Sequence, residues 1–224
     1  MISFLRDRGP ALAAVVVIMF ALSLCQAGIS YSVTFGPLQH VVRSGMVTAG
    51  LVLRFSLIAT MIVLWMAKRK KLVFGLIIVA NALFTVALLS DTEALMARLF
   101  GFASQAIGAL MLDAGLMVVS NILIFSIWYW IIDPPGLEEV RGTHEPWDFL
   151  FPQRASSLPH YGSWVPRYAD YLYLAFTTSF AFSPTDTLPL TRRAKMLMLL
   201  QSAISVVTLT GIAGAAINIL AGSK

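Results

Sequence analysis

The sequence has little charge and a single cysteine. Only 12% of its 224 residues are charged, whereas 58% are hydrophobic, and the mean hydropathy is +0.80. A soluble domain carries about twice this share of charge. The one cysteine, Cys25, excludes an intramolecular disulfide framework. The composition therefore predicts an all-α membrane protein with several transmembrane helices.

The sequence also lacks the motifs of the common enzyme classes. It contains no phosphate-cradling glycine loop, no metalloprotease motif and no recognisable nucleophile–base pair. His144, Glu145, Asp148 and His160 do not have the compact spacing of metal ligands. We therefore expect no enzyme activity, no cofactor and no metal site.

The net charge of +5 does not indicate a nucleic-acid partner. The positive residues lie beside hydrophobic segments, where membrane topology explains them more simply. The expected surroundings are the lipid bilayer.

Five apolar runs are long enough to span a bilayer core, which takes about 20 residues. The first follows Arg6 and Arg8 like a signal peptide, but it continues past Cys25, so we interpret it as an uncleaved helix. The runs are Pro10 to about Tyr31, Gly45 to Ala67, Leu72 to Ser90, Phe102 to Ile132, and Ala194 to Ala221.

A shorter segment, Arg167 to Phe182, precedes the last run. As a helix it reaches only ~24 Å, which is less than the thickness of the core. It also carries Asp170 and the hydroxyls of Thr177, Thr178 and Ser179. We expect it to re-enter the membrane rather than cross it, with a sixth crossing as the alternative. The expected fold is five transmembrane helices plus one re-entrant half-helix.

The distribution of Lys and Arg predicts a cytoplasmic N-terminus, because these residues are in excess on the cytoplasmic side. With the N-terminus inside, only Arg43, Arg98 and Lys224 fall outside. We expect the protein in a bacterial inner (plasma) membrane. The positive residues that fall inside are Arg6, Arg8, Lys68, Arg69, Lys70, Lys71, Arg141, Arg154, Arg167, Arg192, Arg193 and Lys195.

The C-terminal part resembles the pore module of potassium channels, in which a pore helix and a filter loop precede the inner helix. Tyr173-Leu-Ala-Phe176 aligns with the Y-F-S-F of the pore helix, and Asp186, Pro189 and Thr191 align with the D, P and T after the filter. The chain also looks like bacterial membrane families of unknown function that share this pattern. The resemblance implies an N-terminal three-helix region (1–101) and a pore-like module (102–224). The module would comprise an outer helix (102–132), a polar loop (133–166), a re-entrant helix and turn (167–191) and an inner helix (194–221).

The filter departs from the potassium-channel pattern. Where T-V-G-Y-G stands in the family, this chain reads Ala181-Phe182-Ser183-Pro184-Thr185, with no glycine to let successive carbonyls face the axis. We therefore expect an ion-channel-like pore that does not select potassium, a small permeant ion, and a homo-oligomer, tetrameric by analogy. Charge places this loop inward, whereas potassium channels open theirs outward. The filter-equivalent residues are Thr177, Thr178, Ala181, Phe182, Ser183, Pro184, Thr185 and Asp186.

Polar residues within the apolar runs are further candidates, because their burial is expensive. Four such residues lie on four different helices: Gln26, Arg54, Asn81 and Asp113. Arg54 and Asp113 lie at similar depth, so we expect these two to form an ion pair. The pair is either structural or the coupling site of a secondary transporter, the alternative function. A non-conducting membrane scaffold is the third possibility.

The last apolar run carries small and hydroxyl-bearing residues at every third position: Ser202, Ser205, Thr208, Gly211 and Gly214. Such a stripe permits close helix packing. Alternatively, it lines a pore, with Gly211 as a bending point. Trp128, Tyr129 and Trp130 at the end of the fourth run are typical of an interfacial aromatic belt.

Overall fold

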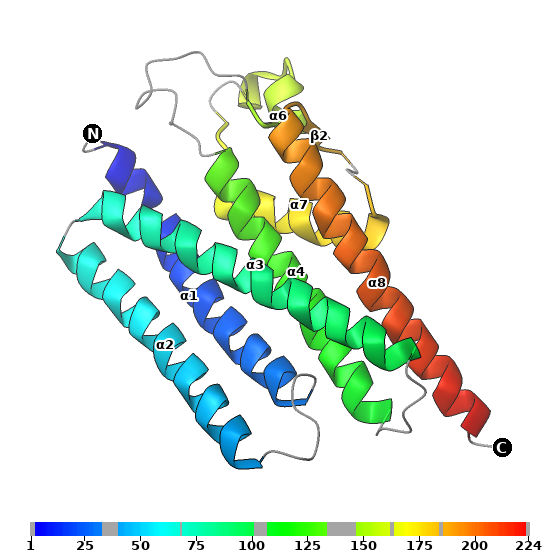
Figure 1. Ribbon diagram of the computed structural model, residues 1–224. Helices are drawn as coiled ribbons and strands as arrows, with labels where there is room; N and C mark the ends of the chain where they lie inside the picture. Colours follow the sequence, from blue (N-terminus) through cyan, green and yellow to red (C-terminus); the bar gives the residue numbers. More distant parts are fainter. Residues whose placement is uncertain are drawn as a thin grey trace. The chain divides into compact units, whose positions relative to one another are not determined.

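The computed structural model describes residues 3–32, 40–67, 69–100, 107–133, 147–161, 164–183 and 186–222 (Figure 1). The described chain is predominantly helical, as the sequence predicts. Its helices are α1 (Ser3–Ser32), α2 (His40–Met66), α3 (Lys70–Phe100), α4 (Ile107–Ile132), α6 (Pro152–Ala155), α7 (Tyr168–Ala181) and α8 (Arg192–Gly222). A short 3₁₀ helix (Pro159–Tyr161) and two strands, β1 (Phe149–Leu150) and β2 (Leu188–Pro189), complete it.

Three described helical segments are long and apolar enough to cross a membrane: Leu72–Ala97, Met111–Ile132 and Arg192–Gly214. They indicate an integral membrane protein. The first two expected crossings fall partly on residues whose side chains lie outside the described set. Their described parts are shorter apolar helices, Ala14–Ile29 and Val52–Met66. The structure therefore shows three candidate spans, not the five that we expected.

The chain divides into two compact units. The first unit contains residues 1–15 and 125–203, and the second contains residues 16–124 and 204–224. Helices α1, α4 and α8 each contribute one part to each unit. The boundary at residue 101, which the resemblance implies, stays a prediction.

In the second unit, α2 and α3 form a helical hairpin, and beside the turn at Ala67 the Arg69 N–H donates to the Leu64 carbonyl. The buried side chains of α3 recur every three or four residues and form one face: Val73, Ile77, Phe84, Leu88 and Leu95. Its other face exposes large apolar side chains, among them Val79, Leu83 and Val86. A lipid-facing helix has this distribution, since lipid tails are as apolar as the exposed side chains.

Close packing holds α1 against α4 in the same unit. A Cβ atom added at Gly28 would lie 2.9 Å from the Leu116 Cδ1 atom, so the missing side chain permits the approach. Small residues at helix contacts act in this way in membranes, where packing and hydrogen bonds drive helix association.

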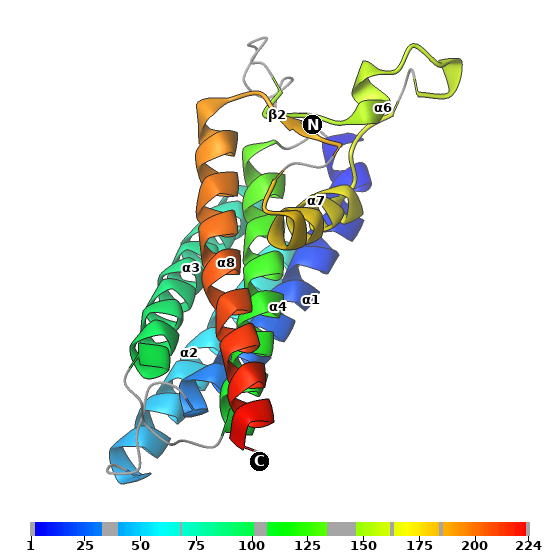
Figure 2. The same ribbon diagram turned by 90° about the vertical axis from the view of Figure 1, so that its right-hand side faces the viewer.

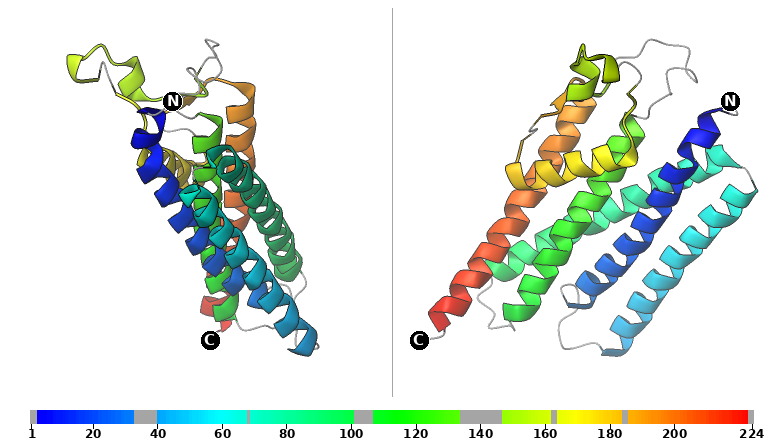
Figure 3. Two further views of the ribbon diagram at one scale, coloured as in Figure 1. Left: turned by 90° about the vertical axis from the view of Figure 1, so that its left-hand side faces the viewer. Right: turned by 180° about the vertical axis from the view of Figure 1, so that it is seen from behind.

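In the first unit, α7 lies across the C-terminal end of α4 and the N-terminal end of α8 (Figures 2 and 3). Strand β1 precedes α7 in the chain and β2 follows it. The two strands pair in antiparallel register, with Phe149 opposite Pro189 and Leu150 opposite Leu188. Aromatic rings fill the space beneath this pair. Tyr129 and Phe149 meet edge to face at 5.1 Å between ring centroids, and Phe151 and Tyr171 meet at 5.6 Å. The strand pair brings the two ends of the segment that contains α7 close together.

Candidate functional site

Both ends of helix α7 have an identifiable cap. At its start, the Asp170 carboxylate accepts the Arg167 N–H at 2.6 Å, which satisfies a donor at the helix N-terminus. At its end, Phe182 adopts a left-handed conformation (φ 55°) and donates its N–H to the Thr178 carbonyl. Buried residues recur at helical spacing on one face: Tyr168, Tyr171, Leu174, Ala175, Thr178 and Ser179.

The Gln201 side chain is the centre of a buried polar cluster on this face. Its amide nitrogen donates to the Ala175 carbonyl and to the Ser179 hydroxyl, each at 2.8 Å. Its oxygen accepts a hydrogen bond from the Tyr129 hydroxyl. Gln201 is 0% exposed. One side chain on α8 thus binds both α4 and α7.

The position of Gln201 shows how far α7 extends along α8. Gln201 follows Arg192 by nine residues, or about 13 Å of helix. The C-terminal half of α7 lies at that level, because Ala175 and Ser179 bind Gln201 directly. The chain then returns to Thr191 at the start of α8. Helix α7 therefore packs against α8 at the level of Gln201.

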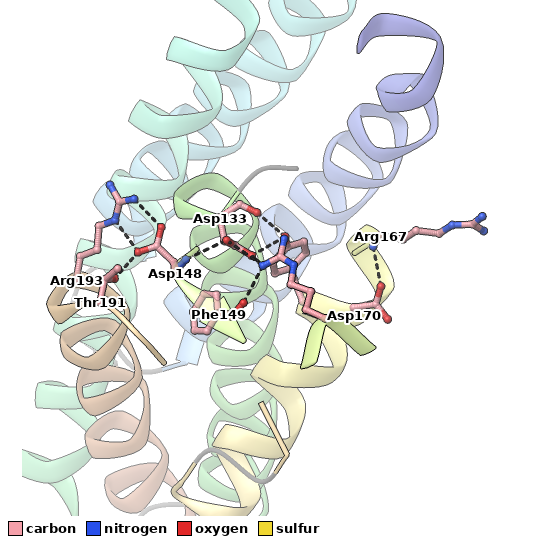
Figure 4. A network of polar contacts seen from close by, with 9 residues as sticks. Asp133, Asp148, Phe149, Arg167, Asp170, Thr191 and Arg193 are labelled. Carbon is pink, nitrogen blue, oxygen red and sulfur yellow. Dashed lines mark hydrogen bonds and ion pairs between the residues drawn. The ribbon is translucent and has the colours of Figure 1, made fainter. Parts of the chain in front are cut away.

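A second cluster holds the base of this segment around the Asp133 carboxylate (Figure 4). Arg154 approaches Asp133 Oδ2 at 3.1 Å, and the Tyr171 hydroxyl approaches the same oxygen at 3.0 Å. The Asp148 N–H donates to Asp133 Oδ1 at 3.1 Å. Burial raises the pKa of the Asp133 carboxyl, although the Arg154 guanidinium opposes the rise. The ion pair therefore stabilises a carboxylate that is otherwise costly to bury.

Asp148 makes the companion ion pair. Arg193 binds its two carboxylate oxygens at 2.7 and 2.6 Å, and the Thr191 hydroxyl donates to one of them. Arg193 is 48% exposed, so solvent weakens this pair more than that of Asp133 with Arg154, whose side chains are 5% and 8% exposed. Together the two pairs attach α4, β1 and the start of α8 to one another.

The filter-equivalent residues occupy different environments. Thr177 and Thr178 donate to backbone carbonyls within α7, and Thr178 is buried. Ala181, Phe182, Ser183 and Asp186 are exposed. Pro184 and Thr185 lie outside the described residues. The described part of the loop therefore leaves the turn after α7 open to an external partner or to solvent.

The small-residue stripe on α8 is mostly buried within this chain. In the second unit, the Asn121 amide donates to the Ser205 hydroxyl at 2.8 Å, and Thr208 donates to the Ile204 carbonyl on its own helix. Gly211 is also buried, whereas Ser202 is half-buried. This environment favours close helix packing, and the pore-lining role of the stripe stays a prediction.

Asp91, which we did not single out from sequence, is near enough to both expected partners in the second unit to interact with each electrostatically. Arg54 and Asp91 interact electrostatically, and Asp91 interacts with Asp113 in turn. The Arg54 guanidinium also lies 5.9 Å from the Phe84 ring centroid. No contact between Arg54 and Asp113 is described, so a direct pair stays a prediction.

The two other polar candidates within the helices, Asn81 and Gln26, are both buried. The Asn81 amide donates to the Ile124 carbonyl at 3.1 Å and so joins α3 to α4. Gln26 is buried in α1. Tyr129 is not part of an interfacial belt, because it is buried and binds Gln201. A lone glutamine within an apolar run was the signal that could have identified Gln201.

No family model, curated protein or solved structure matches this chain.

We expect Arg154→Met to destabilise the protein by about 3–5 kcal/mol, because the change leaves the buried Asp133 carboxylate without its ion-pair partner. Arg192→Met is the matched control, since Arg192 is exposed at the start of α8. Unfolding in mild detergent measures both changes. Equal stability of the two variants would contradict the role of the pair.

Gln201→Met should loosen α7 from α8, because each buried polar group that loses its partner costs about 1–3 kcal/mol. Limited proteolysis of the segment 186–190 reports this release. Ser202→Ala, one residue further along α8, is the control. An unchanged cleavage rate in Gln201→Met would show that Gln201 does not anchor α7.

Double-mutant cycles should show a larger coupling energy for Arg54 with Asp91 than for Arg54 with Asp113. The variants are Arg54→Gln, which removes the charge with a shorter side chain, and Asp91→Asn and Asp113→Asn, which preserve size. Residues that interact give coupling energies of about 0.5–3 kcal/mol. Coupling of Arg54 to Asp113 alone would instead support the direct pair.

Proposed function

We propose that this protein is the subunit of an ion-channel-like pore, with five transmembrane helices and one re-entrant helix, α7. The observation that supports this most strongly is the attachment of the C-terminal half of α7 to Gln201, partway along the apolar helix α8. A helix that enters beside a transmembrane helix and then returns has the arrangement of a pore helix.

The hydrogen bonds at the end of α7 support a location within the membrane. Non-helical backbone persists at membrane depth only where protein or a water-filled cavity satisfies its polar groups. Here the Thr178 carbonyl, one of the last four of α7, accepts the Phe182 N–H. This bond satisfies one of the polar groups that a helix end leaves without a partner in the helix.

The outward face of α7 supports an oligomer. Tyr173, Phe176 and Phe180 are exposed there at helical spacing, and the rings of Phe176 and Phe180 lie 4.8 Å apart. One α4–α7–α8 unit cannot enclose a pore alone, so the proposal requires several copies, four by analogy with potassium channels. Thr178 to Asp186 would form the constriction for a small ion.

We place the N-terminus and the polar loop 133–166 on the cytoplasmic side of a bacterial inner membrane. The excess of Lys and Arg in the segments assigned to that side supports this orientation.

The pore should conduct without selecting potassium over sodium. Ala181 to Thr185 contains no glycine, so a stack of carbonyls facing the axis cannot form as it does in potassium channels. Purified protein in liposomes, under opposed potassium and sodium gradients, tests this. A reversal potential near that of potassium would contradict the loss of selectivity, and no flux of any ion would contradict the pore.

Cysteine labelling tests the orientation. After Cys25 is replaced, a cysteine at Ser156, in the polar loop, should resist an impermeant reagent added outside intact cells and react after lysis. A cysteine at Arg43 is the matched position, because the charge count places it outside. The opposite labelling pattern would show that the topology is inverted relative to this assignment.

A further inference from the structure

The first part of α8, which belongs to the first unit, has two opposite faces. Ala194 and Met198 are buried and face the interior of that unit. On the other face, Met196 and Leu199 are 61% and 63% exposed, and Ala203 is exposed as well. These exposed residues recur at spacings of three and four, so they form one continuous apolar face of the helix.

This apolar face carries positive charge at its N-terminal end. Arg192 and Lys195 lie on it at helical spacing, and both are exposed. Between them, Arg193 is directed toward Asp148 and paired with it (Figure 4). Among the described residues, neither Arg192 nor Lys195 has an ion-pair partner, and the first turn of α8 contains no acidic residue. Two positive charges are therefore available to an external anion.

The length of this face matches one leaflet of a bilayer. From Arg192 to Ala203 the helix rises about 16 Å, and half of a hydrocarbon core is about 15 Å thick. The face belongs to the segment Arg192–Gly214, which is long and apolar enough to cross a membrane. A molecule complementary to this face is negatively charged at one end and apolar along the rest. A phospholipid with a net negative charge has this form.

We propose that the face of α8 from Arg192 to Ala203 binds an anionic phospholipid. The Arg192 guanidinium and the Lys195 ammonium bind the phosphate oxygens, because such charge-assisted hydrogen bonds are strong. An acyl chain packs along Met196 and Leu199. A second copy of this chain fits the same face less well, since copies inserted in the same direction would bring their positive ends to the same level. This inference does not depend on the pore proposed for α7 and α8.

Quenching by brominated lipids tests the proposal in the full-length protein. After Cys25 is replaced, a fluorophore is attached at Leu200→Cys, an exposed position beside the face. The protein is placed in nanodiscs of phosphatidylglycerol and phosphatidylcholine in equal amounts, with only one of the two lipids brominated in each sample. Phosphatidylglycerol should be preferred at the fluorophore by about fivefold or more, because each Lys or Arg near the surface attracts anionic lipid.

Charge variants locate the preference. Arg192→Gln and Lys195→Gln should each lower it, and the double variant should quench equally with the two lipids. Arg167→Gln is the matched control, because it removes an exposed positive charge at the start of α7, and it should retain the preference. A fluorophore at Leu83→Cys, exposed on α3 and far along that helix from its Lys and Arg residues, should show no preference.

Equal quenching by the two lipids with Arg192 and Lys195 in place would overturn the proposal, as would a preference that persists in the double variant. Absence of quenching by either lipid would show that the face contacts protein instead, and would also overturn it. Loss of the preference on addition of inorganic phosphate at constant ionic strength would show that the ligand is a free anion and not a lipid.

Discussion

The carboxamide of Gln201 is the group on which the arrangement of the first unit depends. A glutamine side chain both donates and accepts hydrogen bonds, and Gln201 uses both capacities, toward α7 and toward Tyr129 on α4. A leucine or methionine at this position would fill the space but would remove the hydrogen bonds of Gln201 with the Tyr129 and Ser179 hydroxyls and with the Ala175 carbonyl. Three helices therefore share one polar contact that apolar packing cannot replace.

Two kinds of interaction hold α7. The contact with Gln201, nine residues after the start of α8, holds the C-terminal half of α7 at that level of α8. The ion pairs of Asp133 with Arg154 and of Asp148 with Arg193 lie at the base and fix where the segment begins and ends. Each of these two ion pairs joins residues far apart in sequence, so the polar loop and the start of α8 are held to the end of α4. This division allows the turn after α7 to remain exposed while the helix itself is fixed.

Composition and apolar runs were sufficient to predict the helical membrane class, because both depend on local sequence. The three candidate spans of the structure lie within or overlap runs that the sequence defines. The polar contacts required tertiary information. Gln201 and Tyr129 are 72 residues apart, and nothing in either neighbourhood specifies the other. Asp91 was missed because it directly follows an apolar run and so resembled a helix end. Pro184 and Thr185 are two of the five residues that stand in place of the glycine-containing filter, and they lie outside the described residues.

The central claim is that α7 enters the membrane beside α8 and is not a helix lying on the membrane surface. Depth-dependent quenching of a spin label tests this most directly. Labels are placed at Phe180 near the end of α7 and at two exposed positions of α8, Met196 and Leu200. The account predicts that the label at position 180 lies as deep as that at position 200 and deeper than that at position 196. A label at position 180 that is shallower than both would contradict the re-entrant helix.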